Sequence, residues 1–139
     1  MGLDISHALL VAAQATEAFA GHVVQGDMLL LPFASHSFEG AWASGSLHHL
    51  EKAHLPSTLR EVWRVLTLGG ALFLSVERGT GEGLAYPDAD VTGARYYAHY
   101  EPDELASFIR DAGFDVVRVI AGESNERSGG FIALTALRR

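Results

Sequence analysis

Three polar segments of the chain each come directly after a short apolar stretch that predicts a β-strand. Asp4 ends the first stretch, Asp27 follows the second, and residues 44–49 follow the third. In an open α/β sheet, ligands bind beyond the carboxyl ends of the strands. A carboxylate there can accept hydrogen bonds from two adjacent ribose hydroxyls, and a second one can accept from an adenine amino group. With an apolar neighbour covering the ring, the segments together predict a nucleoside pocket.

Each of these residues also has an ordinary structural role. Asp4 precedes an expected helix, where it could cap the first turn or interact favourably with the helix dipole. Asp27 follows Gly26 in an expected turn, where aspartate is common. Methionine, as at Met28, often simply fills a core. The nucleoside pocket therefore depends on the fold bringing the three segments together.

Apolar periodicity, prolines and glycines predict the elements that position these segments. Helices are expected over residues 7–20, from Pro56 to the glycine pair at 69–70, and over residues 102–112. Strands are expected over residues 2–5, 22–25, 38–44, 71–76, 114–120 and 131–137. Residues 79–92 are glycine-rich and predict an irregular excursion. Strands and helices alternate until a closing hairpin, so the predicted class is α/β, with an open, mostly parallel sheet and a C-terminal antiparallel hairpin.

An ordered series of segments gives the sequence a specific resemblance. In chain order these are GLDIS at 2–6, GDMLLLPF at 26–33, SFEGAWAS at 37–44, LHHL at 47–50, LREVWRVL at 59–66 and GG at 69–70. The series resembles the class I S-adenosylmethionine-dependent methyltransferases, specifically their small-molecule type 11 group. Residues 97–114 resemble that family's late helix and hairpin, so the likeness covers nearly the whole chain. It implies a Rossmann-like sheet, a single domain over residues 1–139 and S-adenosylmethionine as the cofactor.

The resemblance also implies roles for residues on the nucleoside side. Asp4 would hold the ribose hydroxyls, and Ile5 would pack against the adenine. Asp27 would accept from the adenine amino group. Met28 would cap the ring and offer its backbone N–H. These four residues are expected to form the nucleoside half of the cofactor site.

Further along the chain, the resemblance implies contacts on the reacting side. Ala43 or Ser44 would face the methionine part of the cofactor through backbone carbonyls. His48 and His49 would border the methyl acceptor. Either histidine could serve as a general base, although packing or hydrogen bonding would also explain both. Three tyrosines could line the acceptor pocket or cover a core edge: Tyr96, Tyr97 and Tyr100.

The sequence departs from the family at the glycine-rich cofactor loop. In the family, this loop, its strand and the next helix precede the segment that matches residues 2–6. That strand lies in the middle of the sheet, between the strands that match those of Leu3 and Trp42. We therefore expect the first strand and helix to be missing. An open gap would cost up to ~10 kcal/mol, against a total stability of about 5–15 kcal/mol. Residues 2–5 would then pair with the strand around Trp42, or another chain would fill the gap, or, as we favour, the sequence is a truncated reading of a longer protein.

The glycines at residues 79–83 do not replace the missing loop. A cofactor loop must open a helix whose N-terminus faces the ligand. Pro87 and the acidic residues after it leave no helix of useful length. We expect this segment to be a flexible insertion over the acceptor site.

Composition excludes several classes of protein. The 139 residues suit one domain, and a net charge of −7 argues against a nucleic-acid partner. The absence of cysteine excludes a disulfide scaffold and thiol catalysis. No apolar run approaches the roughly 18 residues of a membrane span, so we expect a cytoplasmic protein without a membrane partner. Three histidines lie close in sequence but do not share a helix face, so no metal site is expected: His48, His49 and His54.

Two functions from different classes follow. The first is an enzyme that transfers the sulfonium methyl group of S-adenosylmethionine to a small molecule by in-line displacement, mostly through alignment of the reactants. The 139-residue chain alone could be inactive. The alternative is a non-catalytic, methyltransferase-like scaffold or interaction module that self-associates through its incomplete sheet. A nicotinamide-dependent reductase is disfavoured, because its phosphate loop is equally missing and no Tyr-x-x-x-Lys pair occurs.

Overall fold

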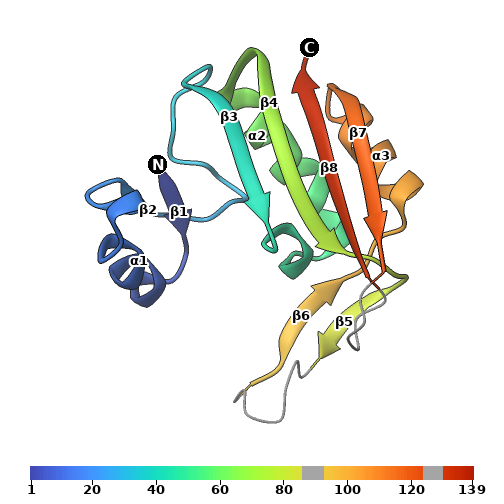
Figure 1. The fold of residues 1–139 in the computed structure, drawn as a ribbon, viewed down its shortest axis with the longest axis horizontal. Coiled ribbons are helices and arrows are strands. Elements are labelled where there is room, and N and C mark those ends of the chain that lie inside the picture. Colours follow the sequence, from blue (N-terminus) through green and yellow to red (C-terminus); the bar gives the residue numbers. More distant parts are fainter. Residues whose placement is uncertain (86–92, 124–129) are drawn as a thin grey trace.

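The computed structural model describes residues 1–85, 93–123 and 130–139 (Figure 1). In these ranges the α-helices are α1 (His7–Gln14), α2 (Leu55–Val65) and α3 (Pro102–Asp111). The strands are β1 (Gly2–Asp4), β2 (Val23–Gln25), β3 (Phe38–Ser44), β4 (Leu66–Glu77), β5 (Glu82–Ala85), β6 (Arg95–Ala98), β7 (Phe114–Gly122) and β8 (Phe131–Arg138). Short 3₁₀ helices are η1 (Glu17–Phe19), η2 (Leu47–His49) and η3 (Lys52–His54). No helix in the described part of the chain is long and apolar enough to cross a membrane.

The main sheet has the strand order β3-β4-β8-β7. β3 and β4 run parallel, with Trp42 opposite Phe73 and Ser44 opposite Ser75. β8 runs antiparallel to both β4 and β7, so the closing hairpin forms as expected. In Figure 1, α2 and α3 lie behind this sheet. The predicted α/β class and open sheet are confirmed.

The core lies between this sheet and the two helices. Alternate side chains of β4 and β8 are buried against the helices, because successive residues of a strand point to opposite faces. The fully buried members of this core include Leu55 and Leu59 of α2, Leu105 and Ile109 of α3, Leu72 and Leu74 of β4, and Ile132 and Leu134 of β8. The apolar faces that the sequence predicted for α2 and α3 are therefore the faces that pack.

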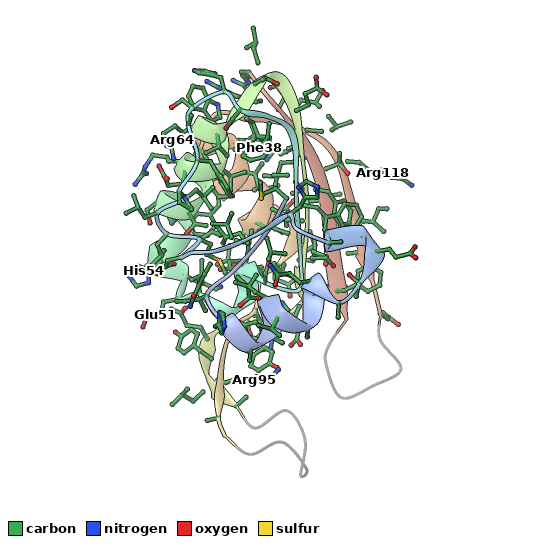
Figure 2. All side chains as sticks on the ribbon, turned by 90° about the vertical axis from the view of Figure 1, so that its left-hand side faces the viewer. Phe38, Glu51, His54, Arg64, Arg95 and Arg118 are labelled. Atoms are coloured by element: carbon green, nitrogen blue, oxygen red, sulfur yellow. The ribbon has the colours of Figure 1, made fainter. Side chains whose placement is uncertain are left out.

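The opposite face of the sheet carries exposed apolar side chains. Trp42 is 74% exposed, and its ring stacks on Phe73 with a centroid separation of 3.9 Å. Figure 2 shows the two sides of the molecule, with Arg64 on the α2 side and Arg118 on the other. The helices of the main sheet thus protect only one of its faces in the described residues.

β1 and β2 form a separate two-stranded parallel sheet. Leu3 pairs with Val24, and Gly26 donates its N–H to the Asp4 carbonyl at 3.0 Å. Among the described residues, β1 pairs with β2 and not with β3. The expectation that residues 2–5 could pair directly with the strand around Trp42 is therefore wrong, and a gap separates β1 from β3.

Two helices end earlier than the sequence predicts. α1 is capped by Ser6, but it ends at Gln14, and the Thr16 hydroxyl then donates to the Ala13 carbonyl at 2.7 Å. α2 ends at Val65 and passes directly into β4, which begins five residues before the expected strand start at Ala71. The glycine pair at 69–70 therefore lies within β4, where the register to β3 shifts.

The segment expected to be irregular, residues 79–92, contains one strand of a hairpin. β5 pairs antiparallel with β6, and Gly83 lies opposite Tyr97. β5 begins after Gly79 and Gly81 and includes Gly83, so these glycines lead into a strand and not into a helix. The four-residue strands show too little alternation to predict the hairpin, and residues 86–92 lie outside the described residues.

Candidate active site

The two predicted carboxylates lie at the carboxyl ends of neighbouring parallel strands. Asp4 ends β1 opposite Gln25, the last residue of β2, and Asp27 follows two residues later. One Asp4 carboxylate oxygen, Oδ1, accepts from the Ser6 N–H at 2.8 Å, and Oδ1 of Asp27 accepts from the Leu29 N–H at 2.9 Å. Each carboxylate is thereby oriented by its own turn and retains a second oxygen for a ligand.

A pocket of about 200 Å³ occupies the gap between β1 and β3. Its lining includes Leu3 of β1, Met28 after β2, Ala43 of β3 and Val62 of α2. The structure thus brings Met28 and Ala43 to one apolar pocket. Ile5 is not among its lining residues and is 69% exposed, with its carbonyl accepting from the Gln25 side chain.

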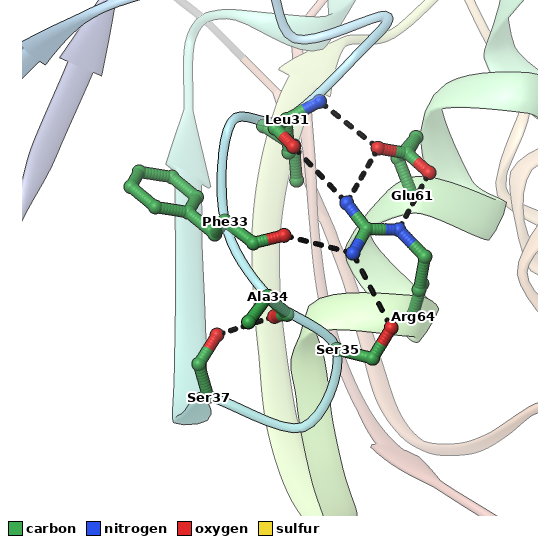
Figure 3. A network of polar contacts seen from close by, with 7 residues as sticks. All are labelled: Leu31, Phe33, Ala34, Ser35, Ser37, Glu61 and Arg64. Atoms are coloured by element: carbon green, nitrogen blue, oxygen red, sulfur yellow. Dashed lines mark hydrogen bonds and ion pairs between the residues drawn. The ribbon is translucent and has the colours of Figure 1, made fainter.

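A network between α2 and the loop after β2 holds this side of the pocket in place (Figure 3). Nη1 of Arg64 donates to the Phe33 carbonyl at 2.8 Å and Nη2 to the Leu31 carbonyl at 3.0 Å. Glu61 accepts from the Leu31 N–H at 2.9 Å and pairs with Arg64. The hydrogen bond from Arg64 lowers the pKa of Glu61. The sequence gave no sign of this contact between α2 and the loop.

The carboxyl end of β3 leads into the two candidate histidines. The hydroxyls of Ser44 and Ser75 lie 2.8 Å apart, and η2 then carries His48 and His49. His48 is 8% exposed, and burial lowers its pKa from 6.5 to about 4, with a further decrease from the neighbouring His49. His48 is therefore neutral at neutral pH. Nδ1 of His49 donates to the Tyr96 carbonyl at 2.9 Å, which ties η2 to β6.

The hairpin adds aromatic and acidic groups to this end of the sheet. The Tyr97 ring stacks on His48, with centroids 5.5 Å apart, and meets the edge of His49 at 4.8 Å. Nε2 of His99 lies 3.2 Å from Oε2 of Glu77. The sequence gave no signal for this last pair, because the two residues are 22 positions apart on elements that it did not predict to meet.

The three tyrosines expected near the acceptor separate in the structure. Tyr97 lies in the histidine cluster, and Tyr96 contributes its carbonyl to His49. Tyr100 is fully buried in the core, and burial raises the pKa of its hydroxyl. The expectation that Tyr100 lines an acceptor pocket is therefore wrong; it covers the core, which was the stated alternative. In the described part of the chain, no three acidic, histidine or cysteine residues are placed to hold a metal ion.

A family model described as "Methyltransferase domain" matches residues 1–74 of the chain. The chain belongs to the methyltransferase family. The domain is 34% identical to O-methyltransferase cnsE of Penicillium expansum over 76% of the chain and 38% of that protein. It is also 30% identical to a protein of Encephalitozoon cuniculi named as a methyltransferase, over 84% of the chain and 62% of that protein. The methyltransferase domain thus spans less than two thirds of either curated relative.

Solved structures share the fold of the methyltransferase domain. A SAM-dependent methyltransferase from Methanosarcina mazei matches with a TM-score of 0.84 and 19% identity, over 99% of this chain and 80% of that one. The 1,6-didemethyltoxoflavin-N1-methyltransferase of Burkholderia thailandensis, solved with 1,6-didemethyltoxoflavin and S-adenosylhomocysteine, matches with a TM-score of 0.76 and 23% identity, over 98% and 59% of the respective chains. The Rossmann-like methyltransferase architecture is therefore confirmed.

Proposed function

We propose that the protein is an S-adenosylmethionine-dependent methyltransferase acting on a small molecule. The observation that carries this proposal is the adjacency of Asp4 and Asp27 at the ends of β1 and β2, beside an apolar pocket lined by Met28 and Ala43. The relatives and the Burkholderia structure, which holds S-adenosylhomocysteine and 1,6-didemethyltoxoflavin, support both the cofactor and the acceptor class.

The residues present fit the nucleoside part of such a cofactor. Each carboxylate keeps one oxygen outside its turn, as a ribose hydroxyl or an adenine amino group requires. Met28 would cap the ring, and Ile5, exposed next to Asp4, would pack on its other side. Ala43 and Ser44 would border the methionine part. None of the described α-helices begins at a glycine-rich turn, so the described residues offer no glycine loop for that part.

The cofactor, when bound, supplies an electrophilic methyl group on a sulfonium centre. The chain's own residues bind and orient: the nucleoside carboxylates fix one end, and the cluster around His48 and His49 borders the space for the acceptor. Alignment of the acceptor with the methyl group would supply most of the rate enhancement.

Replacing the carboxylates tests this function. In calorimetry, the full-length protein should bind S-adenosylmethionine saturably in the micromolar range. Asp4→Asn and Asp27→Asn should each weaken binding about 10- to 100-fold, because a hydrogen bond to a charged group contributes about 1.5–3 kcal/mol. Asparagine keeps Oδ1 and hence the turn contacts to Ser6 and Leu29. Asp111→Asn, at the exposed end of α3, is the matched control and should bind like the wild type. An absence of saturable binding, or equal effects of all three variants, would contradict the proposal.

A non-catalytic interaction module is the second candidate, favoured by the open edge of β3. In the described residues β3 pairs only with β4, and Trp42 beside the gap is 74% exposed. An unpaired edge flanked by apolar surface promotes association between chains.

Light scattering on the 139-residue chain tests this second candidate. We expect concentration-dependent self-association that Trp42→Lys weakens roughly tenfold, because the charge would be buried at the contact. Leu68→Lys is the matched control, since Leu68 is 79% exposed near the start of β4. A chain that stays monomeric and binds S-adenosylmethionine would exclude the module and favour the enzyme.

A further inference from the structure

The Glu77–His99 pair lies at the reacting end of the sheet and has no part in the proposed nucleoside site. Glu77 is the last residue of β4, two residues beyond Ser75, which lies opposite Ser44 at the end of β3. The pair therefore shares this edge with η2 and its two histidines. Both side chains are 31% exposed, so a ligand can reach them while the protein restricts their motion.

The backbone around the pair fixes its geometry from both sides. Tyr100 donates its N–H to the Glu77 carbonyl at 3.2 Å, and Gly79 donates to the Tyr100 carbonyl at 3.0 Å. The His99 N–H donates to the Gly81 carbonyl at 3.0 Å. Gly79 has φ +151°, and a Cβ there would lie 3.2 Å from Cβ of His99. The β5–β6 hairpin is thus hydrogen-bonded to the end of β4 in the register that places the imidazole of His99 against the carboxylate of Glu77.

The chemistry of the pair determines which imidazole nitrogen is free. An ionised carboxylate only accepts hydrogen bonds, so Nε2 of His99 carries the proton and donates it to Glu77. Nδ1 then carries the lone pair and has no partner in the described residues. A histidine oriented by a carboxylate through one nitrogen can take a proton with the other.

The rings next to His99 indicate the shape of the molecule that would meet it. Tyr97 lies two residues before His99 on β6, and their rings are 21° from parallel with centroids 6.3 Å apart. Tyr97 is in turn 27° from parallel to His48. Nδ1 of the buried His48 has no hydrogen-bond partner among the described residues. A wall of nearly parallel rings favours a flat aromatic ligand.

We propose that His99 is the general base for the methyl acceptor, that Glu77 is its positioning residue, and that the acceptor is a planar aromatic molecule with an ionisable hydroxyl. The inference rests on the proposed methyltransferase function. The acceptor oxygen forms a bond to the sulfonium methyl carbon, and the bond from that carbon to sulfur breaks with its electron pair left on sulfur. The hydroxyl proton passes to Nδ1 of His99, which becomes an imidazolium and later releases the proton to water.

A phenol whose ionisation is visible tests this proposal without turnover. Para-nitrophenol absorbs at different wavelengths as phenol and as phenolate, and it is added to the full-length protein at a pH where the free probe is mostly neutral. We expect the wild type to bind it saturably as the phenolate. His99→Asn should hold at least about tenfold less phenolate, because the proton acceptor is gone. Glu77→Gln should give an intermediate amount, and His54→Asn, an exposed histidine on η3, should match the wild type.

A second measurement protects the test against a variant that fails to fold. Nitrogen NMR of the wild type should show His99 as the Nε2–H tautomer, and Glu77→Gln should give a mixture, because an amide can donate as well as accept. Neutral bound probe in the wild type, undiminished phenolate in His99→Asn, the opposite tautomer, or no saturable binding would each overturn the proposal. Calorimetry with S-adenosylmethionine separates a failure of the methyltransferase function from a failure of the assignment of His99. An absence of cofactor binding would contradict the methyltransferase function. A failed probe test together with normal cofactor binding would contradict only the assignment of His99 as the base.

Discussion

Replacing Leu59 by alanine should lower the free energy of unfolding by about 2–5 kcal/mol, the usual range for removing a fully buried leucine. Leu59 is 0% exposed and lies on the face of α2 that packs on the main sheet. Its loss leaves a cavity beneath the helix that also lines the candidate pocket through Val62 and carries Arg64. Urea unfolding followed by tryptophan fluorescence measures the change.

Leu68→Ala is the control for this experiment, because Leu68 is 79% exposed and its removal costs little packing. We expect that variant to stay within about 0.5 kcal/mol of the wild type. Because domains are stable by only about 5–15 kcal/mol, the Leu59→Ala chain should also unfold at a clearly lower urea concentration. Similar midpoints for the two variants would show that α2 does not anchor the fold.

The elements that the sequence predicted well are those with a strong local signal. The spacing of Leu55, Leu59 and Val62 marks the buried face of α2, and Ser6 caps α1 through a local side-chain bond. The apolar run of residues 131–137 becomes β8 and pairs with β7 as expected. In each case the information lies within one turn or one strand.

The parts that the sequence missed depend on contacts between distant residues. β5 and β6 have only four residues each, which is too short for a clear alternation of apolar and polar side chains. Their hydrogen-bonded pairing with each other defines them instead. Arg64 lies on the polar face of α2, yet it binds carbonyls some 30 positions earlier in the chain. Glu77 and His99 meet only because the hairpin returns to the end of β4. No periodicity encodes such contacts.

The candidate site falls between these two cases. The adjacency of Asp4 and Asp27 follows from topology, because neighbouring parallel strands end at one edge. Their ligand roles are predictions that the binding experiments test, and the roles of Ile5, Met28, Ala43 and Ser44 also remain predictions. The missing family strand predicts a gap between β1 and β3, but we expected an open gap to cost too much to persist. In the described residues the gap stays open, and a pocket lies in it.

The buried imidazole of His48 should make the protein lose stability as the pH falls below neutrality. Its pKa is about 4 in the folded protein, below the ordinary 6.5, because burial disfavours the charged form. The unfolded chain therefore binds a proton first. The contribution of neutral His48 is complete above pH 6.5 and is lost progressively as the pH falls toward 4. One pKa unit corresponds to about 1.4 kcal/mol, and since solvent still reaches part of the ring, we expect a loss of about 2 kcal/mol.

His48→Phe isolates this effect, because phenylalanine keeps a ring against Tyr97 and cannot take up a proton. The free energy of unfolding of each protein is measured by urea titration at several pH values between about 7 and 4. Carboxylates titrate in both proteins and cancel in the difference, so toward acid the free energy of unfolding should fall by about 2 kcal/mol more for the wild type than for the variant. His7→Phe, at an exposed position on α1, is the matched control. If the free energy of unfolding falls equally toward acid for the wild type and His48→Phe, then His48 takes up a proton as easily in the folded chain as in the unfolded one. Burial would then not keep the imidazole neutral.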